Sequence, residues 1–117
     1  MINYMGSLSR PEIVKPFTPR WVAKISEFDA IEVRPCAIVG RNSRGRKFVE
    51  PSQPEDASFW TVYGHYRPGG AISGVEAIQD FGTEKEAQQF HDRLMGNYPN
   101  LIRRYKQVKH QQYRREI

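Results

Sequence analysis

The chain has 117 residues, of which 38% are hydrophobic and 26% are charged, and this suits one globular domain with a single core. Its formal net charge is +5, and we expect neither a signal peptide nor a membrane-spanning segment, because no sufficiently long apolar run is present. The lone Cys36 excludes an internal disulfide and predicts a reducing, cytoplasmic location.

The excess positive charge lies at the carboxyl end of the chain. Residues 1–100 carry twelve basic and twelve acidic side chains, so this part is neutral. Residues 101–117 hold six cations against a single acid, Glu116, and supply the whole excess. Because clustered cations attract acidic partners, the sequence predicts one domain over 1–100 and a basic tail over 101–117.

An extended lead-in and a short first element are predicted at the amino end. Residues 1–17 contain Pro11 and Pro16 and few apolar anchors, which favours an extended segment. Thr18 and Pro19 form a typical helix start. The apolar positions 21, 22, 25 and 28 favour a short helix, whereas alternation at 21, 23 and 25 leaves a strand open.

Two strands joined by a polar loop are predicted next. Residues 31–39 are rich in β-branched side chains, and Pro35 predicts a sheet edge or a bulge near it. Residues 41–47 are polar and contain Gly45, a pattern typical of a hairpin loop. Residues 48–50 return as a short strand, and the proline-containing stretch 51–56 is a surface connection.

The strongest strand signal covers residues 59–67. Alternation places Trp60 and Val62 on one face of the strand and Tyr63 and His65 on the other. We expect the first pair in the core and the second pair exposed, where it could contact a partner. Residues 68–70 form a turn, and residues 75–81 return as an antiparallel strand.

A helix is predicted over residues 83–95. Thr83 and Glu86 match a capping box, and Ala87, Phe90 and Leu94 form an apolar stripe at helical spacing. Residues 96–97 end the helix, and a second helical run after residue 99 or an irregular tail completes the chain. The elements together predict an α+β fold, in which an antiparallel sheet of three to five strands is packed by one amphipathic helix.

No motif in the sequence indicates catalysis. His65, His91 and His110 lack the spacing of metal ligands, and no phosphate-binding or dinucleotide-binding loop is present. Cys36 on a strand is expected to pack in the interior rather than to act as a nucleophile. We therefore predict a non-enzymatic protein without metal or cofactor. An enzyme centred on His65 with Asp80 or Cys36 remains an alternative.

Basic side chains interleaved with tyrosines are typical of nucleic-acid binding, because cations follow the phosphates and aromatic rings stack on bases. We expect them in the hairpin loop, in the tail and on the exposed face of the central strand. The predicted binding residues are Arg41, Arg44, Arg46, Lys47, Arg103, Arg104, Tyr105, Lys106, Lys109, Arg114, Arg115, Tyr63 and His65.

Two functions are consistent with this pattern. The first is a binding module for nucleic acid or for a complex that contains nucleic acid. The second is an inhibitor that blocks an acidic or nucleic-acid-binding site on a protein partner. A short α+β body with basic extensions is typical of accessory proteins of phages and plasmids. A homodimer through an exposed strand edge near Phe48 and Val49 is also left open.

Overall fold

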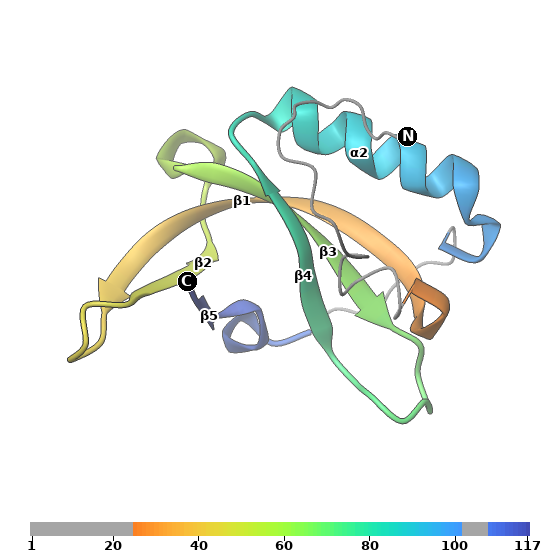
Figure 1. The fold of residues 1–117 in the computed structure, drawn as a ribbon, viewed down its shortest axis with the longest axis horizontal. Coiled ribbons are helices and arrows are strands. Elements are labelled where there is room, and N and C mark those ends of the chain that lie inside the picture. Colours follow the sequence, from red (N-terminus) through yellow and green to blue (C-terminus); the bar gives the residue numbers. More distant parts are fainter. Residues whose placement is uncertain (1–24, 102–107) are drawn as a thin grey trace, which may run out of the picture.

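A computed structural model describes residues 25–101 and 108–117 (Figure 1). The expected lead-in over 1–17 and the helix start at Thr18 lie outside these ranges. The described residues form a five-stranded antiparallel sheet, in the order β4-β3-β1-β2-β5, with one α-helix packed on it. The α+β prediction is therefore confirmed. Three of the six cations predicted for the tail, and its first tyrosine, also lie outside the described residues: Arg103, Arg104, Lys106 and Tyr105.

The strands follow the predicted segments closely, and the C-terminal strand is an addition. The strands are β1 (Phe28–Arg41), β2 (Lys47–Pro51), β3 (Phe59–Tyr66), β4 (Val75–Phe81) and β5 (Arg115–Glu116). The α-helix is α2 (Glu84–Asn97), and the short 3-10 turns are η1 (Ile25–Glu27), η2 (Pro54–Asp56), η3 (Pro99–Leu101) and η4 (His110–Tyr113).

The long strand β1 changes its partner along its length. Residues 28–36 pair with β3, and residues 36–41 pair with β2. Pro35 lies at the change, and its carbonyl accepts a hydrogen bond from Ser52 N at 2.8 Å, beyond the end of β2. The ring nitrogen of Pro35 faces the same side as its carbonyl, beyond the end of β2. The N–H group that proline lacks therefore removes no hydrogen bond from either strand ladder. The prediction of an edge at Pro35 is wrong, since β1 is central, and its register shifts lie at 28–30 and 38–40.

The main core fills the space between α2 and one face of the sheet (Figure 1). Val62 is fully buried there and Trp60 packs against the same cluster, as the alternation of β3 predicts. Gly64 continues this face, and a Cβ atom at Gly64 would lie 2.8 Å from the ring of Phe28. The close approach of an aromatic ring therefore requires glycine at this position. The strand and helix residues of the core are Phe28, Ile31, Val62, Tyr66, Ile78, Ala87, Phe90 and Leu94.

The start of α2 is confirmed in detail. The Thr83 hydroxyl oxygen accepts a hydrogen bond from Glu86 N at 3.2 Å, and the hydroxyl lies 3.1 Å from the Glu86 carboxylate. This arrangement satisfies one of the amide donors that a helix leaves without a partner in its first turn. The helix ends at Asn97, as the residues at 96–97 predict.

The C-terminal residues cover the opposite face of the sheet, where Figure 1 shows η4 and β5. Tyr113 is only 4% exposed and packs against Cys36 and Tyr63. β5 pairs with β2, so the edge expected at Phe48 and Val49 is covered. Residues 108–117 are therefore an integral part of the domain, and we refer to them as the C-terminal segment.

Candidate functional site

A hairpin arm, which we define as residues 38–48, projects from the body of the molecule (Figure 1). Side-chain hydrogen bonds brace its turn, since the Asn42 side chain accepts hydrogen bonds from the backbone N–H groups of Arg44 and Arg46 at 2.9 and 3.0 Å. Gly45 has a φ of 81°, in the left-handed region that favours glycine. The predicted hairpin loop is therefore confirmed and holds a defined shape.

The arm carries four cations and no acid. Arg41 donates to a backbone carbonyl of the turn at 3.1 Å, and Arg46 Nε lies 3.4 Å from a carboxylate oxygen of Glu116. Within the described ranges, Arg44 and Lys47 take part in no ion pair. The charge of the arm is thus only partly compensated, and its three arginines are exposed to solvent.

Three consecutive residues of the C-terminal segment each bind a carboxylate on a different strand. We refer to these contacts as the carboxylate clamp. The pairs are Tyr113 with Glu32 on β1, Arg114 with Glu50 on β2, and Arg115 with Asp80 on β4. The clamp therefore neutralises two of the cations predicted to bind nucleic acid, whereas Lys109 is exposed.

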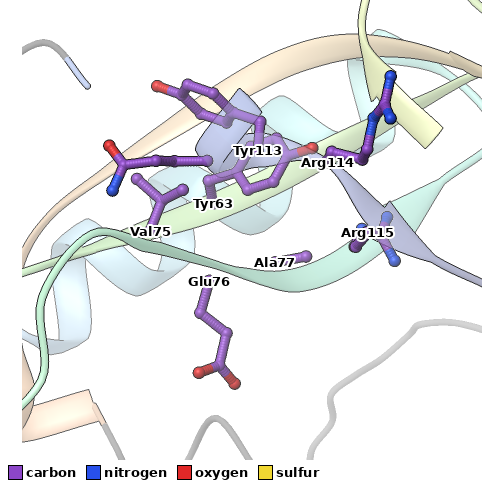
Figure 2. Close-up of a pocket in the computed structure, with 8 residues that line it drawn as sticks. Tyr63, Val75, Glu76, Ala77, Tyr113, Arg114 and Arg115 are labelled. Atoms are coloured by element: carbon purple, nitrogen blue, oxygen red, sulfur yellow. The ribbon is translucent and has the colours of Figure 1, made fainter. Parts of the chain in front are cut away.

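An open pocket of about 330 Å³ lies beside the clamp (Figure 2). The pocket has an apolar wall, formed by Val75, Ala77 and the rings of Tyr63 and Tyr113. Arg115 also lines it, and its Nε is buried without a hydrogen-bond acceptor among the described residues. Glu76, Gln112 and Arg114 complete the lining, so the pocket joins an apolar wall to several polar side chains.

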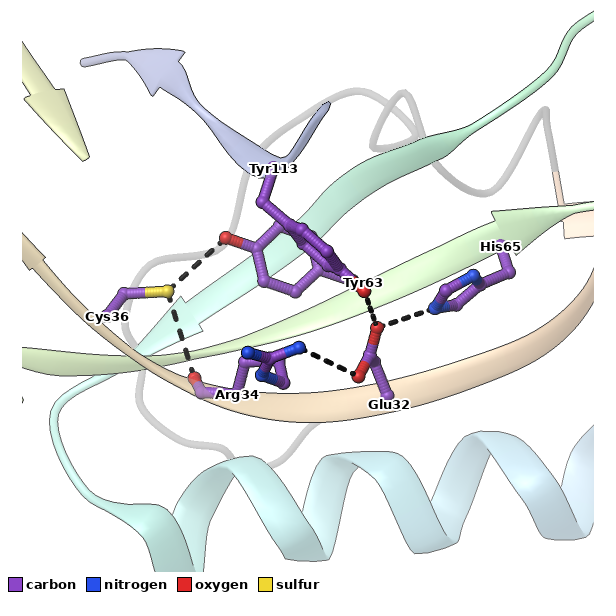
Figure 3. Close-up of polar contacts among 6 residues, drawn as sticks. All are labelled: Glu32, Arg34, Cys36, Tyr63, His65 and Tyr113. Carbon is purple, nitrogen blue, oxygen red and sulfur yellow. Dashed lines mark hydrogen bonds and ion pairs between the residues drawn. The ribbon is translucent and has the colours of Figure 1, made fainter. Parts of the chain in front are cut away.

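Glu32 is the centre of a buried polar cluster beneath Tyr113 (Figure 3). Its carboxylate lies 2.6 Å from His65 Nε2 and accepts a hydrogen bond from the Tyr113 hydroxyl at 2.5 Å. Arg34 Nη1 lies 3.6 Å from the other carboxylate oxygen. Burial opposes ionisation of Glu32, but the hydrogen bonds from His65 and Tyr113 hold the pKa of the carboxyl below its usual value. The cluster therefore keeps a charge in the interior by surrounding it with donors.

The prediction that Tyr63 and His65 are exposed is wrong. Their exposed fractions are 1% and 3%, because the C-terminal segment covers this face of β3. The Tyr63 hydroxyl lies 3.3 Å from Cys36 Sγ, and burial together with this thiol raises the pKa of Tyr63. The Tyr113 ring meets the Tyr63 ring edge-on at 4.9 Å. These residues belong to the interior and not to a binding surface.

The alternative of an enzyme centred on His65 gains no support from these contacts. His65 binds Glu32, Asp80 accepts from Thr61 at 2.7 Å and from Arg115, and Cys36 contacts Tyr63. The structure thus gives the three candidate groups separate partners.

The remaining histidines each pair with one carboxylate. His91 Nδ1 lies 2.9 Å from Asp92, and His110 Nε2 lies 2.9 Å from Glu50. Over residues 25–101 and 108–117, no three His, Cys, Asp or Glu side chains gather in a way that could hold a metal ion. In that same part of the chain, no helix combines the length and the apolar character needed to cross a bilayer.

No known protein family, curated protein or solved structure matches this chain.

Proposed function

We propose that the protein is a non-enzymatic module that binds nucleic acid through its hairpin arm. The observation that carries this proposal is the arm's set of four cations without an acid, displayed on an element that projects beyond the folded body. Arg44 and Lys47 form no ion pair with the described residues, and in this proposal they are the main residues that contact the phosphates. Cations placed in this way attract phosphates, and binding releases the counterions that the nucleic acid carries.

Other elements of the described structure are less positive than the arm. The connection 52–58 carries two acids and no cation, and the helix α2 carries three acids and two cations. A polyanion is therefore drawn toward the arm rather than toward the helix side. The charged residues of α2 are Glu84, Lys85, Glu86, Asp92 and Arg93.

The C-terminal cations have a secondary role in this proposal. Arg114 and Arg115 are already bound by carboxylates, whereas Lys109 is exposed. The unpaired Cys36, buried against Tyr63, supports a reducing compartment such as the cytoplasm as the place where binding occurs.

The proposal is tested by measuring affinity for a labelled mixed-sequence nucleic acid at about 50 and about 200 mM salt. The variant R44Q/K47Q should bind more weakly, and its log–log salt dependence should be shallower by about two, since each phosphate contact contributes roughly one to the slope. The control K85Q/R93Q removes the same charge from α2 and should bind as the unmodified protein does. Absence of binding at low salt, or equal losses in both variants, would overturn the proposal.

A second candidate function is binding to a protein partner, as an inhibitor of an acidic or nucleic-acid-binding site. It is favoured by Ile38 and Val39, which are 43% and 51% exposed at the base of the arm, next to its cations. A complex from the native host that survives nuclease digestion and is lost in I38T/V39T, but not in the control I72T, would support this function over the first.

A further inference from the structure

We infer that the nucleic acid which fits the hairpin arm is double-stranded DNA, contacted in its major groove. This inference rests on the proposed function and narrows it to one class of nucleic acid. It is supported by the shape of the arm, by the burial of the aromatic rings and by the way in which the cations face one another.

The arm has the form of a two-stranded ribbon. Gly40 pairs with Phe48 and Arg41 with Lys47, and the turn at 42–46 closes the ribbon. The pairing of β1 with β3 ends at Cys36, so along 37–41 the outer edge of β1 has no strand beside it in the described part of the chain. On the other side β5 pairs with Phe48 and Val49, and Ile117 exchanges two backbone hydrogen bonds with Lys47, at 2.8 and 3.3 Å. Among the described residues, the β1 edge of the ribbon is therefore free along 37–41, whereas on the β2 side the end of the chain lies beside the ribbon as far as Lys47 and leaves the turn at 42–46 as its narrow tip.

A ribbon of this kind matches one type of groove. The major groove of B-form DNA is about 12 Å wide and admits a two-stranded β-ribbon. The major groove of A-form RNA is deep and narrow, so side chains cannot reach the base edges in it. The shape of the arm thus favours duplex DNA over duplex RNA.

The burial of the aromatic side chains argues against binding of single-stranded nucleic acid. Proteins that bind single-stranded nucleic acid stack the bases on exposed aromatic rings. Among the residues that the structure describes, every Phe, Trp and Tyr is buried or half-buried. Phe48, the aromatic residue of the arm, has the Arg114 guanidinium 5.7 Å from its ring centroid. The arm therefore offers charge without a stacking platform.

Two cations of the arm are placed where they lower the stability of the hairpin. Arg41 and Lys47 lie directly opposite each other in the β1–β2 ladder, and like charges at such positions destabilise a hairpin. Departures from local rules of this kind are expected at functional sites. An anion between the two side chains, such as a phosphate beside the groove, removes the repulsion. The opposed pair therefore indicates a site for phosphates along both strands of the ribbon.

The test compares the affinity of the protein for three probes of one sequence, each about 20 nucleotides long: double-stranded DNA, single-stranded DNA and double-stranded RNA. Binding is measured by fluorescence anisotropy at about 100 mM salt. We expect the DNA duplex to bind roughly tenfold more tightly than either of the others. Equal or tighter binding of single-stranded DNA or of RNA overturns this inference but leaves the proposed function standing. Binding of none of the three probes refutes the proposed function itself.

Groove choice and folding are checked separately. Bound protein should protect guanine N7, which lies in the major groove, from dimethyl sulfate, and protection of adenine N3 in the minor groove instead would overturn the inference. The variant R41Q/K47Q should lose most of its affinity for the duplex. The substitution removes a repulsion but also the hydrogen bond from Arg41 to the Gly45 carbonyl, so the melting temperature of the variant is measured beside its affinity. A loss of binding at an unchanged melting temperature supports the inference, and unchanged binding overturns it.

Discussion

At the scale of single residues, the hydroxyl group of Tyr113 is one of the contacts that hold the C-terminal segment on the sheet. That hydroxyl binds the buried carboxylate of Glu32, which also binds His65. A charged acceptor in the interior needs every donor that surrounds it, since an unsatisfied buried group costs free energy. The contact therefore couples the stability of the core to the placement of the C-terminal segment.

The substitution Y113F should lower the free energy of unfolding by about 1–3 kcal/mol, because it removes a donor from a buried carboxylate while keeping the ring. Chemical denaturation followed by circular dichroism measures the loss. The matched control is Y98F, since the hydroxyl of the half-buried Tyr98 has no hydrogen bond with the described residues. Equal stability of Y113F and the unmodified protein would show that the Glu32 contact contributes nothing.

At the scale of elements, the hairpin arm depends on the conformation of a single residue in its turn. Gly45 lies at φ 81°, yet a Cβ atom there would have nothing within 4 Å. The requirement for glycine at this position is therefore conformational and not steric, in contrast to Gly64 beneath Phe28.

The substitution G45A should lower stability by about 1 kcal/mol, because a side chain disfavours the left-handed conformation. Gly40, on the same arm, has equally open surroundings and no left-handed φ, so G40A should change stability much less. Thermal unfolding of both variants measures the difference. Equal effects of the two substitutions would contradict the conformational explanation.

The elements that could be predicted are those whose signals are local. The alternation in β3 and the cap at Thr83 each fall within a few residues, and both are present in the structure. The partner change of β1 at Pro35 and the docking of Tyr113 could not be predicted in this way. Tyr113 and Glu32 are 81 positions apart, and no periodicity links two residues at that distance.

The candidate site was predictable to a similar extent. The hairpin loop and its cations follow from composition, because a polar segment with glycine between two strands is exposed. The burial of Tyr63 and His65, and the pairing of Arg114 and Arg115 with carboxylates, follow from one tertiary event, the docking of the C-terminal segment over β3. Charge counted along a sequence does not reveal which carboxylate will neutralise it in the fold.

At the scale of the whole molecule, carboxylates hold the C-terminal segment, so stability should depend on pH. The pKa values of Glu32 and Glu50 both lie below the ordinary value of 4.5. Burial raises the pKa of Glu32, but the hydrogen bonds from His65 and Tyr113 lower it further than burial raises it. The pKa of Glu50 is lowered chiefly by its hydrogen bond from Arg114. A lowered pKa in the folded state stabilises the fold above the unfolded-state pKa, and this contribution is lost as pH falls through the folded-state pKa.

We therefore expect the free energy of unfolding to decrease as the pH falls below about 4.5. Denaturation at a series of pH values should show a smaller decrease for E32Q than for the unmodified protein, although E32Q is less stable at pH 7. The control E55Q alters an exposed acid of η2 and should keep the full decrease. A parallel pH profile for E32Q would contradict the assignment to Glu32.

Cys36 pairs with Phe59 of β3 on one side and with Pro51 of β2 on the other, so it belongs both to the body and to the base of the arm. Its sulfur also touches the Tyr63 hydroxyl, which lies under Tyr113. A change in the angle of the arm at Cys36 should therefore alter the surroundings of these two edge-on phenol rings. We expect the near-ultraviolet circular dichroism of these tyrosines to change when a ligand bends the arm.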